Sequence, residues 1–252
     1  QADTLPFYTG FEPGDDTLWR CVNGPSTTSG DPNRWILGSA VAYSGSRSIY
    51  ITDDGDSNHQ TPGVQPAVYF TNAFAYKTFY FDTGDYAIIY DWHNNDGYIR
   101  VVLEPSDFGF DARIMNLGTP TGGYSLDGGR ALRDHTNWQT FSDTVTVDSA
   151  GYYHFVLYWF GGASSGQPPA AIDNISLYRV TCPVVRNLTV DSVAQGAASI
   201  SWTPYGSESE WAVTVGNRTS IVSSPTFFFN DTATTEIYTI SVRPICGVGD
   251  TG

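Results

Sequence analysis

Short segments of alternating apolar and polar residues recur along this chain of 252 residues, and turn-forming residues separate them. A period of two residues is typical of a β-strand with one buried face. We find no stretch of a dozen residues with the 3.6-residue period of an amphipathic helix. Many short strands between turns predict an all-β chain that folds as a sandwich or barrel. The clearest segments are 47–52, 77–82, 86–93, 98–104, 140–147, 152–160 and 171–180.

The alternating pattern restarts after Thr181-Cys182-Pro183, which predicts two domains, residues 1–181 and 182–252. Ile200 and Trp202 are two residues apart in the second domain, so both are predicted to face its core. The four strand-like segments of this domain predict an immunoglobulin-like sandwich. They are residues 187–193, 198–204, 210–216 and 237–247.

Residues 182–252 resemble a fibronectin type III domain, with Tyr238 in the position of that family's tyrosine corner. The resemblance implies an immunoglobulin-like β-sandwich. The family's last strand does not follow, so we expect the chain to be a piece of a longer protein. The motifs that carry the resemblance are Cys182-Pro183, Ser199 to Trp202, Trp211 to Val213 and Tyr238 to Arg243.

The first domain resembles the MAM and cleaved-adhesin (concanavalin-type) jelly rolls of secreted surface adhesins in bacteria. The resemblance implies a jelly-roll β-sandwich that binds a glycan or an extracellular, cell-surface protein. Animal MAM domains have more cysteines, so their disulfide pattern does not transfer. The supporting motifs are Gly10 to Glu12, Asn33 to Gly38, Gly45 to Ile51, Tyr90 to Trp92, Trp138-Gln139 and Pro168 to Leu177.

The same resemblance implies a structural calcium site. In similar carbohydrate-binding jelly rolls, a glutamate of the first strand and an aspartate of the last meet carbonyls of a Gly/Ser stretch. Those positions are Glu12 and Asp173, with Gly45, Ser46 and Ser48 between them. Calcium prefers six to eight oxygen ligands, which such a set would supply in part.

A second, weaker calcium candidate is the sequence Asp54-x-Asp56-x-Asn58. Its spacing is similar to the start of a calcium-binding loop, but Gly55 comes early and no glutamate occupies the twelfth position. The alternative is a solvated turn without a metal ion.

Aromatic side chains could stack on sugar rings, because they combine a flat apolar face with a polar edge. Trp159 and Phe160 precede the loop that starts at Gly161-Gly162, and Trp35 is a third candidate. The alternative is that these rings fill the core, since a sandwich needs large residues between its sheets.

The three cysteines predict one disulfide and one free thiol. Cys182 and Cys246 flank the same small domain, so we expect them to pair and Cys21 to stay free. A Cys21–Cys182 bond is the alternative. A disulfide indicates an oxidising compartment, and the first residues are typical of a mature end after signal-peptide removal.

No catalytic motif of a serine hydrolase or metalloprotease is present, so we expect no enzyme activity. The net charge of −14 and the scattered 12 basic residues exclude nucleic-acid binding, and no apolar run predicts membrane insertion. We therefore expect a non-catalytic adhesion protein. The alternatives are the accessory region of a secreted hydrolase or protease, and a structural subunit of a surface appendage or extracellular matrix.

Residues 230–239 (NDTATTEIYT) read as the conceptual translation of a common sequencing-adapter oligonucleotide. We hypothesise that they replace native residues, and resequencing the locus would test this. No functional prediction rests on residues 226–239.

Overall fold

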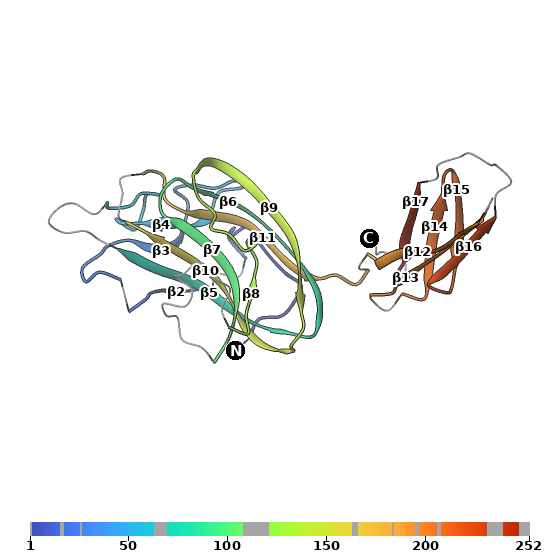
Figure 1. Ribbon diagram of the computed structural model, residues 1–252. Coiled ribbons are helices and arrows are strands. Elements are labelled where there is room, and N and C mark those ends of the chain that lie inside the picture. The colour runs from blue at the N-terminus through green and yellow to red at the C-terminus, as the bar shows by residue number, and fades with distance from the viewer. Residues whose placement is uncertain are drawn as a thin grey trace. The chain divides into compact units, whose positions relative to one another are not determined.

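Every regular element in the described part of the chain is a β-strand, which confirms the all-β prediction. The computed structural model describes residues 2–15, 18–25, 27–62, 70–107, 121–162, 166–182, 184–194, 197–205, 208–230 and 239–246. The chain divides into two compact units, Gln1–Arg179 and Val180–Gly252 (Figure 1). This division lies two residues before the boundary expected from the sequence.

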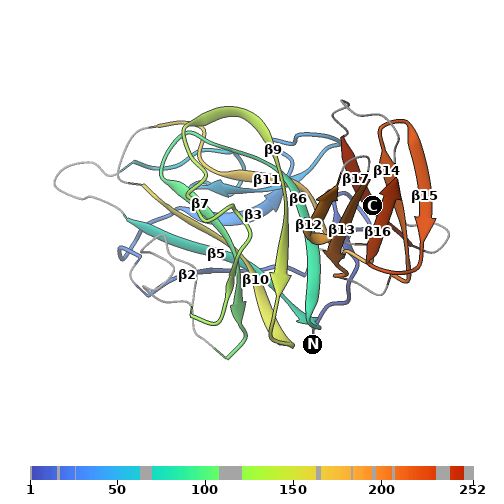
Figure 2. The same ribbon diagram turned by 45° about the vertical axis from the view of Figure 1, so that its right-hand side comes forward.

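The first unit is a jelly-roll sandwich of two sheets, and all their strand pairings are antiparallel (Figures 1 and 2). One sheet has the order β3 (Arg34–Gly38), β4 (Ser48–Thr52), β11 (Ala171–Arg179), β6 (Gly84–Asn94) and β9 (His135–Val147), and β1 (Phe7–Thr9) also pairs with β11. The other has the order β2 (Arg20–Asn23), β5 (Thr71–Phe81), β10 (Gly151–Gly161), β7 (Tyr98–Pro105) and β8 (Tyr124–Ser125).

The main core of the first unit lies between the two sheets. Alternation along β10 directs Phe155, Leu157 and Trp159 into this core, where all three are fully buried. The intervening residues, such as Tyr158 and Phe160, belong to a second apolar cluster on the other face of the five-stranded sheet. The strand therefore has apolar residues on both faces.

In its described residues, the second unit is a small sandwich of two three-stranded sheets. Its sheets have the orders β12 (Arg186–Ala194), β13 (Ala197–Thr203), β16 (Thr226–Asn230) and β15 (Arg218–Val222), β14 (Glu210–Val215), β17 (Ile240–Ile245). Ile200 and Trp202 are buried with Trp211 and Val213, which confirms their predicted inward orientation. The expected tyrosine corner at Tyr238 lies outside the described residues.

A disulfide joins Cys182 to Cys246 within the second unit, as predicted. Cys21 is a free cysteine on β2 of the first unit and is exposed. The described residues contain no helix long and apolar enough to span a membrane.

Candidate binding cleft

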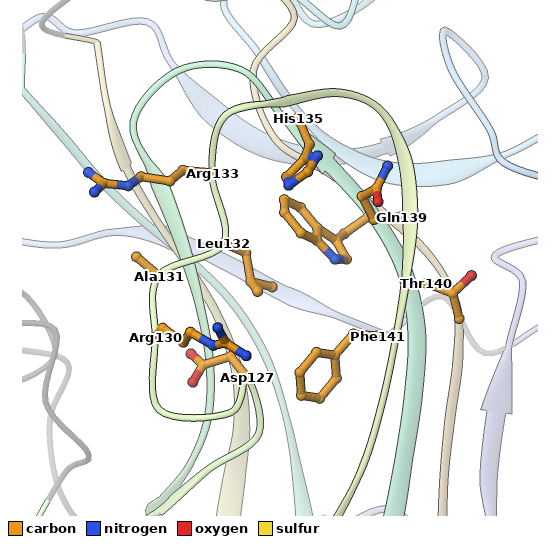
Figure 3. Close-up of a pocket in the computed structure, with 10 residues that line it drawn as sticks. Asp127, Arg130, Ala131, Leu132, Arg133, His135, Gln139, Thr140 and Phe141 are labelled. Atoms are coloured by element: carbon orange, nitrogen blue, oxygen red, sulfur yellow. The ribbon is translucent and has the colours of Figure 1, made fainter.

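A cleft of about 290 Å³ lies between strand β9 and the segment 126–134 of the first unit. Figure 3 shows its two walls, with Asp127, Arg130 and Arg133 on the segment and His135, Gln139 and Phe141 on β9. The cleft thus has the concave form of small-ligand sites, although it is at the small end of their size range. Its ten lining residues are Trp92, Asp127, Arg130, Ala131, Leu132, Arg133, His135, Gln139, Thr140 and Phe141.

Backbone hydrogen bonds fix the segment 126–134 along the edge of β7. The amide of Leu126 donates to the carbonyl of Val101 at 2.8 Å. Leu132 and Ile99 exchange two bonds, at 2.9 and 3.0 Å. The segment is therefore a built wall of the cleft, held at both of its ends.

A buried ion pair anchors the same segment between those two points. Arg100 Nε donates to Asp127 Oδ2 at 2.5 Å, and both side chains are fully buried. The amide of Val101 also donates to Asp127 Oδ2, at 3.0 Å. Because breaking a buried pair leaves an uncompensated charge, this contact strongly favours one position of the segment.

Strand register determines which residues of β9 face the cleft. Gln139 lies opposite Trp92, and Phe141 lies opposite Tyr90, so both share the inner face of the sheet. The ring of Phe141 stacks on that of Tyr90, with centroids 5.0 Å apart. The ring of His135 meets Trp92 edge-on at 5.3 Å. The wall formed by β9 therefore combines aromatic surface with an amide and an imidazole.

The other face of the same strands carries a buried histidine. His93 is 2% exposed, and its Nδ1 has no hydrogen-bond partner among the described residues. The ring of Trp138 stands edge-on against it at 4.5 Å. Burial lowers the pKa of His93 to about 4, because the charged imidazolium is poorly solvated there.

The predicted calcium ligands Glu12 and Asp173 hold one loop, residues 43–47. Glu12 accepts hydrogen bonds from Ser46 N and Oγ, both at 2.6 Å, and from Arg47 N at 3.0 Å. These bonds, chiefly those from Ser46, lower the pKa of Glu12. Asp173 accepts from the amides of residues 43 and 44, while burial raises its pKa. The two carboxylates therefore stabilise this loop through its N–H groups.

The remaining predicted ligands also have structural contacts in or beside this loop. Gly45 has φ +66°, and an added Cβ would lie 2.3 Å from Glu12 Oε1, so the loop requires glycine here. Ser48 Oγ donates to the carbonyl of Val41. The described residues contain no group of three or more His, Cys, Asp or Glu side chains placed to hold a metal. The hydrogen bonds of Glu12 and Asp173 form a clamp on the loop, and calcium binding stays a prediction.

The second calcium candidate forms a hydrogen-bonded turn. Asp54 Oδ2 accepts from Ser57 Oγ at 2.6 Å, and Asp54 Oδ1 accepts from the amides of Asp56 and Ser57, both at 2.8 Å. These bonds, that of the Ser57 hydroxyl first, lower the pKa of Asp54. Asn58 donates to the carbonyl of Ile51 at 3.1 Å. The geometry therefore corresponds to the alternative given above, a turn stabilised by its own side chains.

Two of the three aromatic ligand predictions are wrong. Trp159 is fully buried and donates to the carbonyl of Asp96, and Trp35 is 2% exposed and donates to that of Ala73. Both rings fill the core between the sheets and cannot stack on a ligand. Phe160 is half-buried on the outer face of the five-stranded sheet, away from this core.

The sequence predictions did not include the residues of the cleft. Arg130, Arg133 and His135 follow the turn Asp127-Gly128-Gly129, in a chain with only 12 Lys and Arg residues. This concentration of basic residues beside a glycine turn is the signal that could have identified the segment.

No protein-family model matches this chain, and no curated protein matches it. Several solved structures are similar to it. A family 61 carbohydrate-binding module in complex with β-1,4-galactotriose is 15% identical, with 68% of this chain and 94% of that chain covered and a TM-score of 0.40. The K1 cleaved adhesin domain of Lys-gingipain from Porphyromonas gingivalis is 12% identical, with 69% and 98% covered and a TM-score of 0.40. A family 11 carbohydrate-binding module of a Clostridium thermocellum cellulase is 12% identical, with 68% and 92% covered and a TM-score of 0.34.

Proposed function

We propose that this chain is a non-catalytic glycan-binding protein and that the cleft beside β9 is its binding site. The observation that carries the proposal is the mixture of groups in the cleft. Phe141 and His135 supply aromatic surface, and Arg130 supplies a planar group with several donors. Gln139 supplies an amide oxygen as an acceptor, since its nitrogen already donates to backbone carbonyls of β9. A sugar ring has an apolar C–H face and a rim of hydroxyl groups, so it can use both kinds of contact.

The single carboxylate of the cleft supports binding over catalysis. Asp127 is the only acidic side chain among the ten lining residues. Most glycoside hydrolases use two carboxyl groups on opposite sides of the scissile bond. Asp127 already forms the buried pair with Arg100 and accepts from Ser125 Oγ at 2.5 Å. It is therefore poorly suited to exchange protons with a substrate.

We assign the second unit the role of a fibronectin-like spacer in a secreted or surface-displayed protein. Its two three-stranded sheets and the disulfide support this role, since disulfides persist in oxidising compartments. The same cleft would serve a free adhesin or the accessory region of a secreted hydrolase.

A glycan array followed by isothermal titration calorimetry tests the proposal. We expect His135→Ala and Gln139→Ala to weaken binding of the selected glycan by about tenfold each, which corresponds to about 1.4 kcal/mol. Ser142→Ala is the matched control, because Ser142 is exposed on the same strand and does not line the cleft. Absence of binding across the array, or equal loss in the control, would contradict the proposal.

A further inference from the structure

We infer that the cleft recognises an acidic saccharide through Arg130, an inference that rests on the proposed glycan-binding function. Three basic residues, Arg130, Arg133 and His135, line the cleft together with one acidic residue, Asp127. The side chain of Arg133 points away from β9 (Figure 3), so Arg130 supplies the permanent positive charge that faces the cleft. The chain as a whole carries a net charge of −14. The sign of the charge in the cleft is therefore opposite to that of the whole chain.

The single carboxylate does not cancel the charge of Arg130. Both oxygens of Asp127 face the guanidinium of Arg100, from Nε at 2.5 Å and from Nη2 at 3.2 Å. Oδ1 also accepts from the amide of Gly129 at 3.0 Å. Arg100 and Asp127 are both fully buried, so they neutralise each other inside the protein. The positive charge of Arg130 then has no counterpart among the lining residues of the cleft.

The two arginines differ in how free they are to meet a ligand. Arg133 lies 3.5 Å from Asp134, and both side chains are mostly exposed, so this pair is weak and partly occupies Arg133. Arg130 is exposed, and no ion pair joins it to another side chain in the described part of the chain. Figure 3 shows Arg130 beside Asp127, on the segment that faces Phe141 across the cleft. Arg130 is therefore the cationic group best placed to pair with an anionic group on a sugar.

The geometry of a guanidinium suits the anions that occur on sugars. Its fork of N–H donors binds a carboxylate or a sulfate oxygen pair through two parallel hydrogen bonds. The sugar ring itself would then lie toward the aromatic wall of β9. The many acidic residues elsewhere repel a polyanion only weakly at physiological salt, because charges beyond about 8 Å are largely screened. Selective binding of an anionic glycan to this acidic chain would therefore require a local basic site.

The test measures binding of three oligosaccharides of equal length to the full chain by isothermal titration calorimetry. One carries uronic carboxylates, one carries sulfate esters and one is neutral. We expect an anionic oligosaccharide to bind at least about tenfold more tightly than the neutral one. We expect Arg130→Gln to remove most of that preference, with the affinity for the neutral sugar changed by less than about twofold. The preference should also fall as salt is raised, because the contact is ionic.

Arg218→Gln is the matched control, since it removes the same charge from an exposed position on β15 of the second unit. A preference for the carboxylate or for the sulfate supports the inference and identifies which group is recognised. Equal binding of neutral and anionic sugars overturns the inference and leaves the proposed function intact. An anionic preference that Arg130→Gln does not change overturns the assignment to this residue. If no oligosaccharide binds here or on the array, the proposed function fails as well.

Discussion

The two units are stabilised in different ways. The first unit has a large core from both sheets and a fully buried ion pair. The second unit buries only four hydrophobic residues in the core cluster of its described part, and it contains the disulfide. Small domains bury a smaller fraction of their surface, so a disulfide provides folding stability that packing alone does not. The comparison indicates that packing stabilises the first unit and that cross-linking has a larger share in the second.

Removal of the disulfide gives the largest expected effect. Cys182 and Cys246 are 64 residues apart in the sequence. In the chain-entropy model, a loop of that length is worth about 4 kcal/mol. We expect the double variant Cys182→Ser/Cys246→Ser to lower the free energy of unfolding of the second unit by about that amount. Urea denaturation followed by separate probes for each unit measures it. Equal destabilisation of both units would contradict the larger role of the disulfide in the second unit.

Acidification tests the first unit instead. His93 has an ordinary pKa near 6.5 when unfolded and about 4 when folded. The folded state favours the neutral ring, so this stability is complete above pH 6.5 and is lost as the pH falls toward 4. The loss is about 3 kcal/mol at most. Asp173 acts in the opposite sense, because its raised pKa makes its protonation favour the folded state as the pH falls.

The variant His93→Phe isolates this effect. We expect the melting temperature of its first unit to depend less on pH between 6.5 and 4 than that of the wild type. His59→Gln is the control, since the side chain of His59 is 52% exposed in the same unit. If both variants show the wild-type pH profile, another group causes the acid sensitivity.

Calcium gives the smallest expected effect. Glu12 already accepts hydrogen bonds from Ser46 and Arg47. A calcium ion would therefore stabilise the first unit only by the amount that its contacts exceed these hydrogen bonds in free energy. We expect calcium added after EDTA to stabilise the first unit by less than about 1 kcal/mol, which is a rise in Tm of less than roughly 2–4 °C. A larger rise that Asp173→Asn abolishes would show that an ion organises the loop. Differential scanning calorimetry distinguishes these results, and the second unit should not respond.

Much of the fold could be predicted because strand alternation is a local property. Strands β4, β6, β7, β10 and β11 lie within one or two residues of their predicted segments. The roles of individual rings on β10 could not be predicted in this way. Both faces of this strand are apolar, so its sequence does not tell whether Trp159 or Phe160 faces the core. The choice depends on which sheet covers which face, which is a tertiary property.

The cleft also could not be predicted from local sequence patterns. Arg130 and Gln139 come together because Leu132 bridges Ile99 and because β9 pairs with β6. Neither pairing leaves a periodic signal in the segment 126–134. By contrast, the resemblance to carbohydrate-binding jelly rolls did point to Glu12 and Asp173. These two residues hold the same loop, although they do so through its N–H groups.

Residues on and opposite strand β9 are suitable positions for directed evolution of this protein. This strand lies at the edge of its sheet, and it carries residues that line the cleft, such as Gln139, and exposed residues that do not, such as Ser142. The buried pair of Arg100 and Asp127 holds the facing segment without help from the exposed side chain of Arg130. A library randomised at residues 130, 135 and 139 could therefore acquire new ligand preferences while the core keeps its composition.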